Sequence, residues 1–189
     1  MKMMEQEKIE NGVNVTRLFS TIETIRETPD IAKFKFRATN RWINGTHNQA
    51  SVKDFFGAGK EDDTRTQPFV FDEDEPAVLL GKDMGANPVE YVLVALSGCL
   101  TTSLVAHAAA RGVKLDAVES RLEGDLDVRG FLGMTDEVRR GYRNIRVTFR
   151  IKSDAPREKL QELVEVAQKR SPVFDIVTNP TPVEVRLEA

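Results

Sequence analysis

The N-terminal part of the chain has a helical periodicity. Between residues 13 and 28 the apolar positions recur at intervals of three or four: Val15, Leu18, Phe19, Ile22 and Ile25. This spacing predicts an amphipathic helix, which Thr28-Pro29-Asp30 is expected to end. We therefore assign residues 1–30 to an N-terminal helical extension and residues 31–189 to one domain.

A hairpin pattern follows this extension. Residues 33–42 alternate apolar side chains with Lys and Arg, and Asn44-Gly45 is a strong turn signal. The returning strand is expected at residues 46–52. Residues 56–67 are interpreted as a polar loop, with a short strand at residues 68–71 after it.

The register of this hairpin decides where two arginines lie. A two-residue turn pairs Arg41 with Asn48 and places Arg37 and Arg41 on the face of Ala50 and Val52. Arginines on an apolar face indicate either a functional site or a different register. Both interpretations stay open from the sequence.

The middle of the chain contains a long uncharged stretch. From Tyr91 to Ala110 twenty consecutive residues carry no formal charge, which is enough for a membrane span. Small and hydroxyl side chains and His107 interrupt the stretch, so we expect the central helix of a soluble core instead. Pro88 is a good first helical residue, and Gly112 is expected to close the helix.

The pattern of apolar and polar residues in the C-terminal half predicts two strands, two helical segments and a closing strand. Residues 117–129 and 144–152 alternate apolar with polar side chains, which predicts an antiparallel sheet with one face in water. Pro156 is expected to open an amphipathic helix. Ser171-Pro172 is expected to start a short helical turn that Asn179-Pro180 stops. The closing strand is expected at three alternating apolar residues, Val183, Val185 and Leu187.

Composition narrows the classes of function. The net charge of −3 is spread without a basic block, which argues against a nucleic-acid partner. The single thiol excludes an intrachain disulfide. His47 and His107 are far apart in the sequence, so the two histidines and the cysteine do not have the spacing of metal ligands. We expect no metal and no cofactor. Because the charged N-terminus does not resemble a signal peptide, we expect a cytoplasmic protein without a membrane partner.

Cys99, the only cysteine, is the candidate for chemistry. Small side chains surround it along the helix, which would let another backbone approach closely. A lone cysteine is more often a small buried apolar residue, however, and reactivity requires the thiolate. Cys99 lies about three turns inside the expected helix, beyond the reach of the helix dipole. A cation from another element would therefore be required.

Four stretches resemble the OsmC/Ohr family of osmotically inducible and organic hydroperoxide resistance proteins. They are Asn87-Pro88 through Ser97-Gly98-Cys99, His107 through Val113, Ser171-Pro-Val-Phe-Asp175, and Arg41-Trp-Ile-Asn-Gly45. The order of elements also agrees, so the resemblance covers roughly residues 31–189. It implies an α+β fold with antiparallel-rich sheets wrapped around long central helices. It also implies an intertwined homodimer with active sites at the subunit interface.

The resemblance implies a chemistry as well. Active members of the family use the helix cysteine, which Cys99 matches, as a peroxidatic thiolate that attacks a hydroperoxide and becomes a sulfenic acid. A second cysteine, in a Cys-Pro-Val segment, then condenses with it to a disulfide. An arginine from the first sheet strands and a glutamate just before the helix activate the thiolate. Arg41 and Glu90 are the corresponding candidates here.

The chain departs from the family pattern at two positions. Ser171 replaces the second cysteine and is interpreted as a helix N-cap. Val89 occupies the usual glutamate position, and Glu90 falls about 180° around a straight helix and roughly 13 Å along it from Cys99. Glu90 could then act only across a subunit interface, and Arg41 is the better-placed partner. Three further residues are candidates for the substrate pocket: Arg37, His47 and Ser171.

We expect thiol-dependent reduction of organic hydroperoxides by Cys99 with an external thiol reductant. The alternative is a non-catalytic relative that binds a small apolar or thiol-reactive ligand between subunits, which the loss of the second cysteine and the glutamate favours. An arginine near a solvent-accessible Cys99 would support the peroxidase function. A Cys99 thiol that is sealed among apolar neighbours would support the binding function. An obligate homodimer is expected because one chain of this size cannot cover the uncharged helix on all sides.

Overall fold

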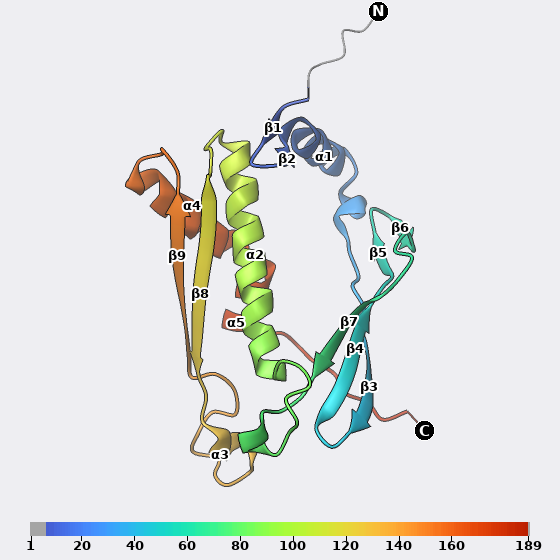
Figure 1. Cartoon of the computed structure of the whole chain (residues 1–189). Helices are drawn as coiled ribbons and strands as arrows, with labels where there is room; N and C mark the ends of the chain where they lie inside the picture. Colours follow the sequence, from blue (N-terminus) through green and yellow to red (C-terminus); the bar gives the residue numbers. More distant parts are fainter. Residues whose placement is uncertain (1–6, 189) are drawn as a thin grey trace, which may run out of the picture. The chain divides into compact units, whose positions relative to one another are not determined.

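The computed structural model describes residues 7–188, and the charged first six residues of the predicted N-terminal extension lie outside this part. The chain divides into two compact units (Figure 1). Unit 1 comprises residues 1–15 and 93–189, and unit 2 comprises residues 16–92. Helices and antiparallel strands occur together, which confirms the predicted α+β class.

Unit 1 begins with a short hairpin. Strands β1 (Ile9–Glu10) and β2 (Val13–Asn14) pair antiparallel. Asn11 and Gly12 at the turn both have positive φ, 50° and 75°, as the favoured two-residue hairpin turn requires. The side chain of Asn11 donates to the carbonyl of Val113 over 2.8 Å, which ties the hairpin to the rest of unit 1.

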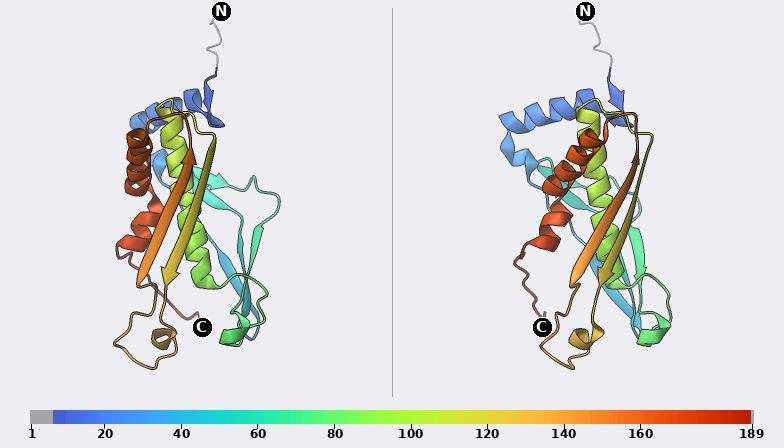
Figure 2. Two further views of the ribbon diagram at one scale, coloured as in Figure 1. Left: turned by 60° about the vertical axis from the view of Figure 1, so that its left-hand side comes forward. Right: turned by 90° about the vertical axis from the view of Figure 1, so that its left-hand side faces the viewer.

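The main body of unit 1 is a β-hairpin with helices on one side (Figure 2). Its elements are α2 (Pro88–Ala110), which begins in unit 2, then β8 (Ala117–Asp125), α3 (Val128–Phe131), β9 (Asn144–Lys152), α4 (Arg157–Arg170) and α5 (Pro172–Thr178). Strands β8 and β9 pair antiparallel along their whole length, with side chains alternately half-buried and exposed. The predicted sheet with one wet face is confirmed.

The core of unit 1 lies between α2, α4 and the half-buried face of this hairpin. Buried residues from the helices and the loop after α2 form it: Leu104, Ala108, Val113, Leu163 and Ala167. Phe149 and Ile151 of β9 pack against them. The helical spacing of Leu96, Leu100, Leu104 and Ala108 gives α2 one buried stripe.

Two predictions for the C-terminal half were wrong. Strand β8 ends at Asp125 and not at residue 129, because Asp127 accepts a bond from the backbone N–H of Arg129 and caps α3. Residues 181–188 form no strand in the described chain, and Val183 and Leu187 are 81% and 98% exposed. A strand needs a ladder partner, and this segment has none among the described residues.

Unit 2 combines a helix with short antiparallel strands. Its elements are α1 (Val15–Glu27, whose first residue belongs to unit 1), the 3₁₀ turn η1 (Pro29–Ala32), β3 (Thr39–Asn44), β4 (His47–Val52), β5 (Phe55–Gly57), β6 (Lys60–Asp62), β7 (Phe69–Glu73) and the 3₁₀ turn η2 (Ala77–Leu79). Strands β3, β4 and β7 form a three-stranded sheet in that order. Part of the predicted polar loop at 56–67 is instead a hairpin, with Ala58 and Gly59 at positive φ in its turn.

The predicted register of the first hairpin was also wrong. Arg41 pairs with Gln49 and not with Asn48, and the register shifts between Trp42 and Asn44. The turn residues are Gly45, with φ of 60°, and Thr46, which fits the hairpin turn that takes glycine first. Arg41 therefore does not lie on the face of Ala50, and the different register explains the apparent arginines on an apolar face.

Helix α2 is long and apolar enough to cross a membrane by length and composition, although neither property shows that it does so. Only 28% of its most apolar window is buried inside the chain. Beside the buried stripe, Val94 is 59% exposed, and Gly98 is exposed as well. A large apolar face of α2 therefore lies uncovered in the single chain.

Candidate functional site

Cys99 is a free, half-buried thiol on α2. It precedes the buried Leu100 by one position, so its side chain is rotated by about 100° from the buried stripe. Its neighbours Gly98 and Thr102 are exposed. The thiol lies at the border between the packed side of α2 and its uncovered side, and it is not sealed in the core.

Glu90 belongs to the cap at the start of α2. The Asn87 side-chain oxygen accepts from the backbone N–H of Val89 over 2.9 Å. The Glu90 carboxylate accepts in return from the backbone N–H of Asn87, also over 2.9 Å. This reciprocal pair is a capping box, which satisfies backbone donors that a helix start leaves unpaired. The structure thus gives Glu90 a local structural role.

The two candidate arginines have different surroundings. Arg37 donates two hydrogen bonds of 2.8 Å to the carboxylate of Glu61. This contact raises the pKa of Arg37 and lowers that of Glu61. Arg41 is exposed on β3, and no ion pair or side-chain hydrogen bond engages it among residues 7–188. Of the two, Arg41 has its guanidinium available for another group.

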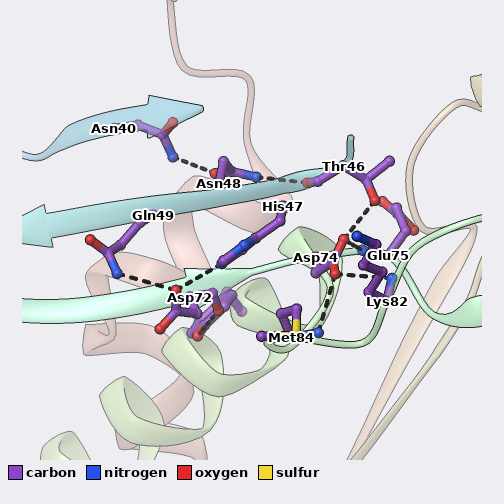
Figure 3. A network of polar contacts seen from close by, with 11 residues as sticks. Asn40, Thr46, His47, Asn48, Gln49, Asp72, Asp74, Glu75, Lys82 and Met84 are labelled. Atoms are coloured by element: carbon purple, nitrogen blue, oxygen red, sulfur yellow. Dashed lines mark hydrogen bonds and ion pairs between the residues drawn. The ribbon is translucent and has the colours of Figure 1, made fainter. Parts of the chain in front are cut away.

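His47 is part of a polar cluster on the β3–β4–β7 sheet (Figure 3). Its Nε2 lies 2.9 Å from Asp72 Oδ1, and the amide of Gln49 donates to the same oxygen over 3.2 Å. These two contacts hold the pKa of Asp72 below its usual value, and the contact with His47 contributes more than that with Gln49. The hydroxyl of Tyr91 donates to the backbone carbonyl of Asp72 over 2.9 Å. The cluster ties the start of α2 to the sheet.

Asp74 organises the loop that leads into α2, and it is not among the residues that the sequence pattern singles out. It is 1% exposed and accepts from the Thr46 hydroxyl over 2.6 Å. Three backbone N–H groups also donate to it, those of Glu75, Lys82 and Met84 (Figure 3). The Thr46 hydroxyl contributes most to lowering the pKa of Asp74 to about 2. An acidic run between two predicted elements was the only signal, and it does not identify which carboxylate is buried.

Ser171 is an N-cap, as the sequence predicts. It is 3% exposed, and its hydroxyl accepts from the backbone N–H of Phe174 over 3.1 Å at the start of α5. Burial of an unpaired N–H is costly, so this hydrogen bond supports the turn into α5. Ser171 is therefore engaged by the backbone of its own helix.

His107 lies two turns beyond Cys99 on α2. Partial burial lowers its pKa, and the positive charges of Arg111 and Arg170 lower it further. The imidazole is therefore neutral at pH 7. A neutral, partly buried histidine among arginines agrees with a packing role.

The candidate residues fall into the two units. Cys99 and Ser171 belong to unit 1, whereas the arginines, His47 and Glu90 belong to unit 2. Among residues 7–188, no three His, Cys, Asp or Glu side chains gather to hold a metal ion.

Comparisons with known proteins identify a matching family and structures with a similar fold. The family model of the OsmC-like protein matches residues 81–186. An OsmC like protein from Mycoplasma pneumoniae has 16% identity and a TM-score of 0.59, over 76% of this chain and 87% of that one. An organic hydroperoxide resistance protein OsmC from Legionella pneumophila has 16% identity and a TM-score of 0.54, over 76% and 88%. The comparison with curated proteins found no match.

The fold and the site define an α+β protein with a free thiol on a long apolar helix. The chain belongs to the OsmC-like protein family, because the matched region covers more than half of it. At these identities the solved structures support the fold alone. The predicted family is thus confirmed.

Proposed function

We propose that this protein reduces organic hydroperoxides through Cys99, with an external thiol as reductant. The Cys99 thiolate attacks one peroxide oxygen, a sulfur–oxygen bond forms, and the oxygen–oxygen bond breaks. The leaving alkoxide takes up a proton and departs as the alcohol, while Cys99 becomes a sulfenic acid. One external thiol then forms a mixed disulfide and releases water, and a second thiol displaces it and restores Cys99.

One observation carries the proposal: the only cysteine of a chain in this family is free and borders the uncovered side of α2. A buried structural cysteine would be inert, because reactivity requires access as well as a thiolate. The external reductant follows from Ser171, which stands where the family motif has its second cysteine. A hydroxyl cannot condense with a sulfenic acid to form a disulfide.

The proposal includes a second copy of this chain. Val94 and Gly98 lie on the uncovered face of α2, and the C-terminal segment exposes alternating apolar residues. Contiguous exposed apolar surfaces mark interaction sites. An unpaired extended segment also suits strand addition to a sheet edge of another molecule. We expect a homodimer that covers α2 in this way.

Mass spectrometry after treatment with stoichiometric cumene hydroperoxide tests the chemistry. The expected product carries one added oxygen on Cys99 and reacts with a sulfenic acid probe. Cys99→Ser is the matched control, and its hydroperoxide consumption with a dithiol reductant should fall to the uncatalysed level. If free cysteine in the same buffer oxidises faster than Cys99, the proposal is wrong.

A second candidate function is non-catalytic binding of a small apolar or thiol-reactive ligand between subunits. One candidate activating residue and one candidate pocket residue are engaged elsewhere, since Glu90 accepts from the backbone N–H of Asn87 and Arg37 pairs with Glu61. Unmeasurable peroxide turnover together with an alkylation rate like that of free cysteine would favour this function.

A further inference from the structure

Unit 1 contains a cavity of about 220 Å³ that none of the candidate site residues lines. Its walls come from four elements: Leu100 of α2, the half-buried face of β9, Val164 of α4 and Phe174 of α5. All the lining residues belong to unit 1.

Six of the seven lining residues have apolar side chains. Three alternate residues of β9 contribute, Ile145, Val147 and Phe149, because side chains two apart share a face of a strand. None of the lining residues is charged, and Gln168 is the one with a polar side chain. Gln168 is exposed, so its amide stands at the rim and not inside.

The cavity is not a sign of a loose core. Leu104 and Leu163 in the same unit are fully buried, and the β8–β9 pairing is continuous. Protein interiors are close-packed, and voids larger than a water molecule are few. An apolar cavity of about 150 Å³ is already large enough to bind benzene. A space of 220 Å³ therefore accommodates one aromatic ring with a small substituent.

We infer that this cavity binds a small molecule with a single aromatic ring and one hydrogen-bonding substituent, of the phenol type. The ring would contact the aliphatic side chains and the two phenylalanines, and the hydroxyl would meet the amide of Gln168 at the rim. A charged group is disfavoured, because no lining residue carries a charge that could pair with it. This inference does not rest on the chemistry of Cys99.

Methyl NMR of the full-length native protein tests the inference, with p-cresol, toluene and benzoate as probes. p-Cresol and toluene should shift the methyl signals of Leu100, Val147 and Val164. They should leave those of the exposed Val183 and Leu187 unchanged. Benzoate, which carries a charge, should shift none of them at the same concentrations.

The Gln168→Leu variant tests the polar contact, and Gln161→Leu, at an exposed position two turns earlier on the same helix, is the matched control. Loss of one hydrogen bond should weaken p-cresol binding roughly three- to tenfold. Toluene binding should stay unchanged in both variants. If Gln168→Leu weakens the binding of p-cresol and of toluene equally, Gln168 does not have the hydrogen-bonding role assigned to it.

Two results would overturn the site itself. One is the absence of methyl shifts in the native protein up to the solubility limit of p-cresol. The other is a set of shifts that benzoate reproduces, or that spread equally to the exposed C-terminal methyls. Because the native protein is titrated directly, the outcome does not depend on whether any variant folds. Peroxide turnover by Cys99 is measured separately and can fail without affecting this result.

Discussion

At the scale of single residues, the most consequential side chain outside the proposed chemistry is the buried carboxylate of Asp74. Its four hydrogen bonds join the Thr46 hydroxyl to the backbone of the loop before α2. The pKa in the folded protein, about 2, lies below the usual 3.8. Its contribution to stability is therefore fully present above about pH 4 and is lost as the pH falls toward 2.

The Asp74→Asn variant should be less stable than the native protein at pH 7, because an amide N–H₂ would face backbone donors. We expect its Tm to fall by roughly 5–10 °C, as for other losses of buried hydrogen bonds in chains of this size. Between pH 4 and pH 2 its Tm should also decline less than that of the native protein. Thermal melts across this range measure both effects, with the exposed Asp63→Asn as control. Parallel acid curves for native protein and variant would contradict the role given to Asp74.

The Ser171→Cys variant tests whether the ancestral geometry survives near Cys99. After one equivalent of hydroperoxide it should form an internal disulfide, provided that the two Cα atoms lie within about 7 Å. The native protein should instead gain a second oxygen under excess peroxide and lose activity, because sulfinic acid is not readily reduced. Non-reducing peptide mapping distinguishes the two, and Ser153→Cys in the same unit is the control. If Ser171→Cys forms no disulfide, the binding function becomes the better candidate.

At the scale of elements, the start of α2 and strand β3 carry the two candidate activating residues. The capping box holds Glu90 to the backbone of Asn87. If this role is structural, substitution of Glu90 should change the stability of the protein and not its peroxidase rate. Strand β3 instead presents Arg41 without a described partner. The structural role of Glu90 and the candidate activating role of Arg41 are tested by separate substitutions.

The Glu90→Gln variant keeps an oxygen that accepts from Asn87 but removes the charge. We expect an unchanged peroxidase rate and a loss of stability below 1 kcal/mol, since the cap hydrogen bond remains while the favourable charge near the helix start is lost. Glu90→Ala should cost about 1 kcal/mol, as typical cap losses do. Urea unfolding and peroxide assays measure the two quantities. A tenfold lower rate for Glu90→Gln with unchanged stability would give Glu90 a chemical role instead.

The Arg41→Met variant should slow Cys99 oxidation about tenfold and move the pH profile of Cys99 alkylation to higher pH, because Arg41 is the candidate cation that would stabilise the thiolate. Alkylation kinetics between pH 5 and pH 9 measure the profile. Arg37→Met is the matched control, since Arg37 is paired with Glu61. Identical profiles for native protein and Arg41→Met would exclude Arg41, and a shift in the control alone would assign the role to Arg37.

At the scale of the whole molecule, the main question is what packs against the uncovered face of α2. A Cβ added at Gly98 would meet nothing within 4 Å in the single chain. Substitution there therefore introduces no clash inside the chain. A second chain packed on this face would meet the added atoms.

The Gly98→Leu variant should accordingly remain folded but dissociate at micromolar concentration, while the native protein sediments as a dimer. Helical structure should persist, since leucine is a better helix former than glycine. Sedimentation velocity and circular dichroism measure these outcomes, with Gln161→Leu as the control for added apolar bulk. A native protein that sediments as a folded monomer would rule out the homodimer.

The local pattern of the sequence predicted the elements whose hydrogen bonds are local or whose faces are defined by periodicity. The helix at Val15–Glu27, the uncharged helix α2, the alternating strands β8 and β9 and the cap at Ser171 are all confirmed. The family resemblance is carried by four short stretches, each made of neighbouring residues, so it was also accessible. These features depend on neighbours within a few positions, which the sequence displays directly.

Tertiary structure alone decided the register of β3 against β4, the burial of Asp74 and the cavity beside Leu100. The turn lies one residue later than the strongest turn signal, and a register shift between Trp42 and Asn44 then moves the side chains beyond it to the opposite face from the one predicted. The burial of Asp74 depends on Thr46, 28 positions away, and the cavity on four elements that meet only in the folded chain. Contacts between distant residues leave no periodic trace in the sequence.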